Sequence, residues 1–316
     1  MKTEIAKLTR KNFKSVLGRA QTLIRKGKLV VFPTETVYGL GADATNERAL
    51  EKIYKAKGRP SDNPIIVHVA NLRQLKLLAQ NPSFFEQKLI KRFWPGPLTI
   101  IFSKRKKISN IVSGGLSTVA VRMPSHPFAR DLISQAGVPI AAPSANISGR
   151  PSGTLGRHLL EDLSGRVDLI VDAGPSGIGL ESTVIKIEKD KILILRPGAV
   201  TREMLKKVSG QEVVFAKSKK DLQFSPGTKY RHYAPKAKLE IFKDARALKK
   251  RLAILKKKNK KVEILKKRNL KEASKNLYRD LRALDARGVD IILAGAYPAQ
   301  DLGAAIMDRL RRASMR

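Results

Sequence analysis

The stretch Leu29-Val30-Val31-Phe32-Pro33-Thr34-Glu35-Thr36-Val37-Tyr38-Gly39-Leu40 joins a short apolar run to a polar turn. The apolar run predicts a buried strand that ends at Pro33, because proline cannot donate a hydrogen bond to a neighbouring strand. Open α/β sheets build their sites at such strand ends, so we take Thr34, Thr36 and Tyr38 as candidate site residues. Helical patterns at 13–25 and 47–57 flank this strand and favour alternation of helices and strands.

The alternation continues to about residue 208 and predicts a twisted mixed sheet with covering helices. Further strands are expected at 65–69, 98–102, 118–122, 139–142 and 168–172, followed by a hairpin over 182–195. From 237 onward, three short strands with intervening helices predict a small Rossmann-like α/β domain. We therefore divide the chain into a first domain at 1–208, a linker at 209–236 and a C-terminal domain at 237–316.

The linker has an unusual composition for a connecting segment. Residues 224–233 contain three aromatic rings, one histidine and two cations, whereas ordinary linkers are polar and flexible. Such a composition favours an ordered segment that folds back over a site.

Composition excludes several classes of protein. The chain has no cysteine, which rules out disulfides, thiolate metal sites and cysteine nucleophiles. Its first residues lack the apolar run of a signal peptide, and nowhere do apolar residues approach the length of a membrane span. We therefore expect a cytoplasmic protein without a membrane partner.

The net charge of +37 is concentrated in the C-terminal part of the chain. Between Lys249 and Lys271 there are twelve cations and a single anion, Glu263. A basic field of this kind attracts nucleic acid by releasing counterions, but it contains few aromatic rings on which bases could stack. The run is therefore compatible either with contact to RNA or with a solvated basic surface.

A second basic motif, Lys57-Gly58-Arg59-Pro60-Ser61-Asp62-Asn63-Pro64, is held between two prolines. Arginine offers a planar fork to an anion and lysine a mobile point charge, so the pair suits a nucleotide phosphate. Taken alone, a motif of this kind is more often a solvated basic turn. Other polar clusters follow predicted strands, and they comprise His68; Arg122 with Ser144 and Asn146; and Glu181, Ser182 and Thr183 with Arg196.

Seven segments in chain order resemble the YrdC-like family. They are Thr34 to Leu40, Lys57 to Pro64, Trp94 to Thr99, Val119 to Pro124, Ala142 to Ser148, Glu181 to Val184 and Leu195 to Gly198. The segment from Ser225 to Pro235 and the C-terminal part resemble the two-domain form of that family. Only about 80 residues follow Lys236, and the lysine-rich run replaces part of the usual second domain, so we expect that domain to be shortened.

The resemblance implies an L-threonylcarbamoyladenylate synthase, a nucleotidyltransferase that joins L-threonine, bicarbonate and ATP and releases pyrophosphate. A separate tRNA threonylcarbamoyl transferase would then modify adenosine 37 of tRNAs reading codons that begin with A, and a weak contact with tRNA is expected. A Mg²⁺ ion should accompany ATP, held mostly by phosphates and water. Its protein ligands are not defined by the resemblance, and Glu35, Asp43 and Asp62 are weak candidates.

The resemblance also assigns residues to the site. Lys57 and Arg59 would be catalytic, by stabilising the transferring phosphoryl group and the leaving pyrophosphate. The residues placed around ATP are Arg59, Asn63, Thr118, Ser144, Asn146, Ser152, Arg196, Tyr230 and His232. Those placed around threonine are Thr36, His68, Arg122, Ala142 and Ser182.

Two other functions compete with this one. The basic charge would also suit a tRNA-binding or double-stranded-RNA-binding protein without synthase activity. A carbamoyl-transfer maturation factor contains a similar domain, but it also carries cysteine-rich zinc fingers, and this chain has no cysteine.

Overall fold

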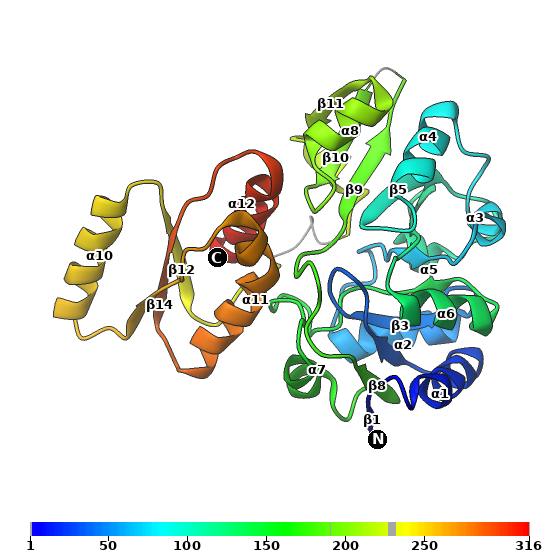
Figure 1. Ribbon diagram of the computed structural model, residues 1–316, viewed down its shortest axis with the longest axis horizontal. Coiled ribbons are helices and arrows are strands. Elements are labelled where there is room, and N and C mark those ends of the chain that lie inside the picture. Colours follow the sequence, from blue (N-terminus) through cyan, green and yellow to red (C-terminus); the bar gives the residue numbers. More distant parts are fainter. Residues whose placement is uncertain (1, 190, 227–231, 316) are drawn as a thin grey trace.

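The chain folds into two α/β units that lie side by side (Figure 1). The computed structural model describes residues 2–189, 191–226 and 232–315. The small unit, yellow to red in Figure 1, turns α11 (Leu270–Ala286) and α12 (Asp301–Ser314) toward the larger one, and α10 (Ala245–Lys257) lies at its far end.

The large unit is built on a mixed sheet of eleven described strands. Their order across the sheet is β1-β8-β2-β3-β7-β4-β6-β5-β9-β10-β11, with both parallel and antiparallel neighbours. The strands are β1 (Glu4–Lys7), β2 (Val30–Phe32), β3 (Gly39–Asp43), β4 (Val67–His68), β5 (Leu98–Ser103), β6 (Thr118–Arg122), β7 (Ile140–Ala141), β8 (Leu169–Asp172), β9 (Thr183–Ile187), β10 (Lys191–Arg196) and β11 (Glu212–Phe215). The helices are α1 (Phe13–Arg25), α2 (Glu47–Lys57), α3 (Leu72–Leu78), α4 (Phe84–Phe93), α5 (Asn110–Ser113), α6 (Pro127–Ala136), α7 (Gly156–Leu163), α8 (Arg202–Ser209) and α9 (Lys219–Leu222).

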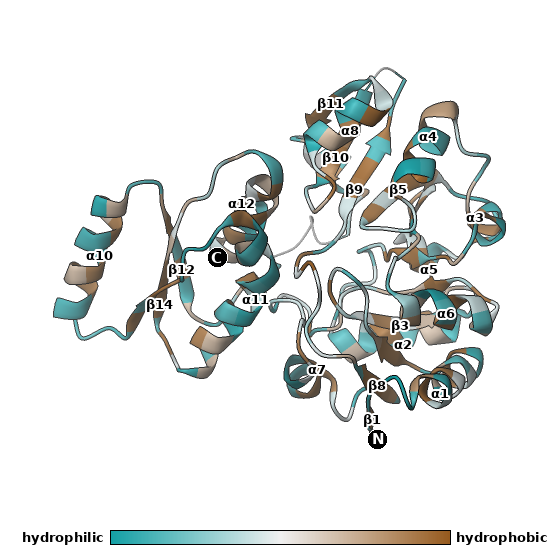
Figure 2. Ribbon diagram, viewed as in Figure 1, coloured by the Kyte–Doolittle hydropathy of each residue, from teal (hydrophilic) through white to brown (hydrophobic). Residues whose placement is uncertain are grey.

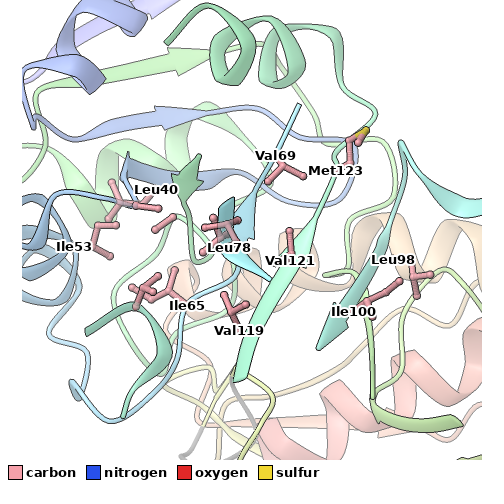
Figure 3. Packing of buried hydrophobic residues seen from close by; sticks show 14 of the residues in the cluster. Leu40, Ile53, Ile65, Val69, Leu78, Leu98, Ile100, Val119, Val121 and Met123 are labelled. Carbon is pink, nitrogen blue, oxygen red and sulfur yellow. The ribbon is translucent and has the colours of Figure 1, made fainter. Parts of the chain in front are cut away.

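Strand β2 shows why the sheet is covered on both faces. Val30 and Phe32 belong to a buried cluster with residues of α1 and α6, whereas Val31 belongs to the main cluster with residues of α2. Alternate side chains of a strand point to opposite faces, so an entirely apolar strand requires apolar cover on both sides. Figure 3 shows part of the main cluster, in which Leu40, Ile53, Ile65 and other apolar residues converge from strands, helices and loops.

Helix α2 leads the chain into the Lys57–Pro64 motif. The Asn46 side chain caps its first turn by accepting from the Ala49 backbone N–H. The helix ends at Gly58, whose φ of 60° places it in the left-handed region that glycine tolerates best. Arg59 follows this turn directly and donates to the Asn63 and Pro64 carbonyls.

The small unit contains a parallel sheet of three described strands in the order β12-β14-β13. These strands are β12 (Lys238–Phe242), β13 (Val262–Ile264) and β14 (Ile291–Gly295). Helix α10 shows both hydrophilic and hydrophobic bands in Figure 2. Only its Leu248 and Leu255 are buried, and most of its basic residues are exposed.

The predicted fold class is confirmed, since a mixed sheet with helices is followed by a small parallel α/β unit. Three strands were not predicted: β1, β3 and β11. Strand β3 contains two glycines and follows a polar turn, and β11 is a four-residue edge strand that pairs with β10 inside the segment expected to be linker. The large sheet therefore extends to Phe215. None of the described helices has the length and apolar character needed to cross a membrane.

Candidate active site

A single cleft collects side chains from the middle of the large sheet and from the segment that precedes the small unit. The space between its walls, open solvent included, is about 510 Å³. Its walls are formed by Thr34, Thr36, Val37, Tyr38, Gly39, Arg59, Ile66, His68, Arg122, Ala142, Pro143, Ser144, Glu181, Ser182, Arg196, Pro226, His232 and Tyr233.

Two buried guanidinium groups line this cleft, Arg59 and Arg196. Arg59 donates from Nη2 to the Pro64 carbonyl at 2.7 Å and from Nε to the Asn63 carbonyl at 3.3 Å. Arg196, at the end of β10, donates from Nε to the Ser182 carbonyl at 3.1 Å. Burial lowers the pKa of Arg59 to about 10, so it stays charged at neutral pH and is available to an anion.

A third cation, Arg122, ends strand β6 and is held by three groups. Its Nη1 donates to Thr36 Oγ1 at 2.8 Å, its Nε donates to the Gly96 carbonyl at 3.2 Å, and its Nη2 lies 2.6 Å from Glu35 Oε1. Burial alone would raise the pKa of Glu35, but the Arg122 charge together with hydrogen bonds from Arg122 and from the backbone outweighs burial and lowers that pKa. Glu35 is therefore ionised and fixes Arg122 in one orientation.

His68 lies on β4, beside β6, with its register partner at Arg122. Its side chain is buried and lines the cleft. Burial, with the nearby Arg122 charge, lowers the pKa of His68 to about 3. The imidazole is therefore neutral at physiological pH and can donate or accept a hydrogen bond without adding charge.

The turn after β7 brings Ser144 to the cleft, and hydrogen bonds from the Lys57 side chain hold this turn in place. Lys57 Nζ donates to the carbonyls of Ser144 and Asn146, both at 2.5 Å. Lys57 is fully buried and its pKa is lowered by burial and by the neighbouring Arg59. It does not itself line the cleft, so its observed contacts are with the turn that carries Ser144.

Ser182 and Glu181 complete the wall at the start of β9. Ser182 Oγ lies 2.7 Å from Thr99 Oγ1 and accepts from Arg196 Nη2 at 3.1 Å. Glu181 accepts from Ser152 Oγ at 2.5 Å. Because Ser152 is hydrogen-bonded to Glu181 and does not line the cleft, it affects the cleft by holding the Glu181 carboxylate.

The segment before the small unit closes one side of the cleft with Pro226, His232 and Tyr233. The His232 and Tyr233 rings meet edge to face, with centroids 4.2 Å apart. Tyr233 has a φ of 65°, a left-handed conformation that is uncommon for residues other than glycine. Tyr230, which we expected near ATP, lies outside the described residues.

Most of the predicted site residues come together in this cleft. The predicted residues that line it are Thr36, Arg59, His68, Arg122, Ala142, Ser144, Ser182, Arg196 and His232. The predicted residues that do not line it are Lys57, Asn63, Thr118, Asn146 and Ser152. Thr118 begins the strand that Arg122 ends, which separates the two by four residues of extended chain.

The sequence prediction missed Tyr233 and did not assign Glu181 to a ligand. Tyr233 follows His232 in the aromatic segment, so its ring was visible in the sequence, but the left-handed backbone that turns it inward was not. Glu181 belonged to a polar cluster, and its partners come from elements far away in the chain.

The weak candidates for Mg²⁺ ligands do not form a metal-binding cluster among the described residues. Glu35 is paired with Arg122, and Asp43 accepts from the backbone and hydroxyl of Thr45. Among the described residues there is no group of three or more His, Cys, Asp or Glu side chains that could hold a metal ion. The donor set of the cleft is cationic and suits anions rather than a metal.

Two family models together match nearly all of the chain. Residues 22–198 match the Sua5_yciO_yrdC family model, described as "Telomere recombination", and residues 200–315 match the Sua5_C model, "Threonylcarbamoyl-AMP synthase, C-terminal domain". A threonylcarbamoyl-AMP synthase of Pyrococcus abyssi is 44% identical, covering 93% of each chain. One of Bacillus subtilis is 43% identical, covering 94% of this chain and 92% of the relative.

A solved structure of Pyrococcus abyssi Sua5 complexed with L-threonine has the same fold. It superposes with a TM-score of 0.89 at 42% identity, covering 99% of this chain and 97% of that one. The two matched regions divide near residue 199, whereas the large sheet extends to Phe215 through β11. The chain therefore belongs to the Sua5/YrdC family of threonylcarbamoyl-AMP synthases.

Proposed function

We propose that the cleft joins L-threonine, bicarbonate and ATP into threonylcarbamoyl-adenylate, with release of pyrophosphate and water. One observation carries this proposal. Three buried guanidinium groups, Arg59, Arg122 and Arg196, line one cleft. The three substrates each bear negative charge, as carboxylate, bicarbonate or triphosphate, and buried arginines are the side chains best suited to hold such groups.

The threonine would lie on the side of the cleft formed by Arg122, Thr36 and His68. Arg122 would hold its carboxylate, since Glu35 and Thr36 already fix the guanidinium in place. Neutral His68 and the Ser182 hydroxyl offer hydrogen bonds to polar groups without competing for the carboxylate. The relative solved with L-threonine is consistent with this class of ligand.

The nucleotide would lie toward Arg59, Ser144, Arg196 and His232. In the reaction, the threonine amine attacks the carbon of bicarbonate, a carbon–oxygen bond breaks, and the hydroxyl leaves as water with a proton from the amine, which gives a carbamate. With carbon dioxide the same carbamate forms by loss of the amine proton to solvent. A carbamate oxygen then attacks the α-phosphorus of ATP in line, and the bond to the bridging oxygen breaks to release pyrophosphate. Arg59 would stabilise the charge that moves onto the leaving group.

This chemistry needs no covalent intermediate with the protein, so it requires no nucleophilic side chain. The cleft would act by holding the reactants in line and by neutralising charge, and such positioning is worth effective molarities on the order of 10⁵ M or more. We assign Lys57 to support of the Ser144 turn, on the strength of its two carbonyl contacts. Its predicted contact with the transferring phosphoryl group would require that turn to move.

We expect Mg²⁺ to enter with ATP and to be held by phosphate oxygens and water, with little direct ligation by the protein. When bound, the ion would neutralise part of the triphosphate charge. The product would pass to a separate tRNA threonylcarbamoyl transferase. A weak contact with tRNA through the exposed cations of 249–271 stays a prediction.

Pyrophosphate release, measured with each substrate omitted in turn, tests the proposal. Wild-type activity should vanish without threonine or without bicarbonate, and Arg59→Ala should lower it by about 100-fold, as for loss of one donor to a developing charge. Arg48→Ala, at an exposed arginine of α2, the helix that precedes Arg59, is the matched control and should keep full activity. Release that ignores threonine, or tight tRNA binding without any synthesis, would contradict the proposal.

A further inference from the structure

Two side chains of the C-terminal domain reach the cleft wall, Arg309 of α12 and Tyr278 of α11. Arg309 Nε lies 2.9 Å from Glu181 Oε2, and the Tyr278 hydroxyl donates to the same oxygen at 2.8 Å. Both side chains are fully buried. Because Glu181 lines the cleft, this contact connects the small domain to the site.

Glu181 is held by three donors from separate parts of the chain. Ser152 Oγ donates to its other oxygen at 2.5 Å, so both carboxylate oxygens are engaged. Burial alone would raise the pKa of Glu181, but the charges of Arg309 and Arg196 lower it to about 2. The carboxylate is therefore ionised, with a fixed orientation beside Arg196.

The same two side chains also hold Tyr233. The Tyr233 ring stacks on Tyr278 with centroids 5.5 Å apart and an angle of 24°, and the Arg309 guanidinium lies 5.1 Å from its centroid. Tyr233 adopts a left-handed backbone conformation, which persists only where the surroundings impose it. The small domain supplies those surroundings, and Tyr233 in turn lies against His232.

Apolar packing also connects the residues around Glu181 and Tyr233 to the small domain. Val37, Leu180 and Tyr233 belong to the apolar cluster formed by the core of that domain. A Cβ atom added to Gly179 would lie 2.5 Å from the Lys275 carbonyl oxygen of α11, so the loop that precedes Glu181 touches the helix backbone. The loop and α11 therefore cannot shift independently.

We propose that Arg309 and Tyr278 are positioning residues, which fix Glu181 and Tyr233 and thereby shape the nucleotide side of the cleft. The inference rests on the proposed function and deepens it, because it gives the C-terminal domain a part in ATP binding. The contacts that fix Arg122, on the threonine side, come from Glu35, Thr36 and Gly96 and involve neither residue. Nucleotide and threonine affinity should consequently respond differently to changes at Arg309 and Tyr278.

Arg282 offers a matched control. It is also a buried arginine of the small domain that contacts the large one, with Nη2 2.5 Å from Asp162 Oδ2 and 2.7 Å from the Pro151 carbonyl. It contributes nothing to the walls of the cleft. A variant at Arg282 therefore loosens domain contact without removing a partner of Glu181.

The test compares Arg309→Met, Tyr278→Phe and Arg282→Met in the full chain. ATP dissociation constants are measured by calorimetry, and KM for threonine by pyrophosphate release. Arg309→Met and Tyr278→Phe should weaken ATP binding by about tenfold, as for loss of a hydrogen bond to a charged group, with threonine KM changed less than about twofold. Tyr278→Phe keeps the stacked ring, so it gives an answer even if Arg309→Met does not fold.

Arg282→Met should leave ATP affinity within about twofold of wild type. The double variant Arg309→Met with Glu181→Gln should bind ATP no worse than Arg309→Met alone, because both changes act on one ion pair. The inference would be overturned if Arg282→Met and Arg309→Met weakened ATP binding equally. It would also be overturned if threonine and ATP affinity fell in parallel, or if the losses of ATP affinity multiplied in the double variant. Absence of threonine-dependent synthesis in the wild type would instead contradict the proposed function itself.

Discussion

Acidification should destabilise this protein strongly, because three of its four histidines are buried and neutral. Burial lowers the pKa of His68, His158 and His232 to about 3 in each case. In the unfolded chain the same groups titrate near 6.5. Below that pH these histidines bind protons in the unfolded chain but not in the folded one. The free energy of unfolding therefore falls as the pH drops from about 6.5 toward 3.

The size of the effect follows from the two pKa values. For one such imidazole, the change from pH 7.5 to pH 5.5 lowers the free energy of unfolding by about 1.4 kcal/mol. Three independent groups together lower it by about 4 kcal/mol, which is a large part of the stability of an ordinary domain. Carboxylates with lowered pKa values add to the loss only at lower pH, since their unfolded values lie near 4.5.

Urea unfolding of wild type and His158→Gln at pH 7.5, 6.5 and 5.5 measures the effect. His158 lies outside the cleft walls, so its replacement tests the electrostatics without disturbing the site. The variant should lose about 1.4 kcal/mol less than wild type over this range. The half-buried His126 provides a comparison, His126→Gln, for which a smaller difference is expected. Equal pH dependence in wild type and His158→Gln would refute the reasoning.

Three further predictions concern the site. Arg122→Met should raise threonine KM by about tenfold or more and change ATP KM little, because a charge-assisted contact to the threonine carboxylate is lost. Steady-state rates of pyrophosphate release measure both constants. Gly198→Ala should abolish most turnover, since its Cβ would lie 2.4 Å from the Thr183 backbone nitrogen; Gly18→Ala, where nothing lies within 4 Å, should leave both turnover and circular dichroism intact. Chelation of Mg²⁺ with EDTA should stop synthesis without changing the thermal unfolding midpoint, and a drop in that midpoint would point to a structural metal.

The sequence predicted the elements whose patterns are local. Helix α2 has an asparagine cap, an apolar face and a terminal glycine, and the structure places it within the predicted range. Strand β2 is an uninterrupted apolar run before a proline, and it lies buried in the sheet as predicted. Strands β3 and β11 escaped prediction because their pairing depends on distant partners, β2 and β7 for the first and β10 for the second.

The site was predicted to the extent that its residues follow strand ends. Arg122 and Arg196 each end a strand, and both line the cleft. The contacts that orient them come from across the fold, such as Glu35 for Arg122, and no local pattern encodes such pairs. Lys57 illustrates the limit, since its charge was evident in the sequence while the two carbonyls that accept its hydrogen bonds lie nearly ninety residues later.

Transfer of isotopically labelled bicarbonate into an adenylate tests the central claim most directly. Wild-type protein is incubated with threonine, ATP, Mg²⁺ and labelled bicarbonate. The products are separated by chromatography and identified by mass spectrometry. We predict a threonylcarbamoyl-adenylate that carries the label, appears together with pyrophosphate, and is absent when threonine is left out. Cleavage of ATP without label in any adenylate would contradict the proposed function.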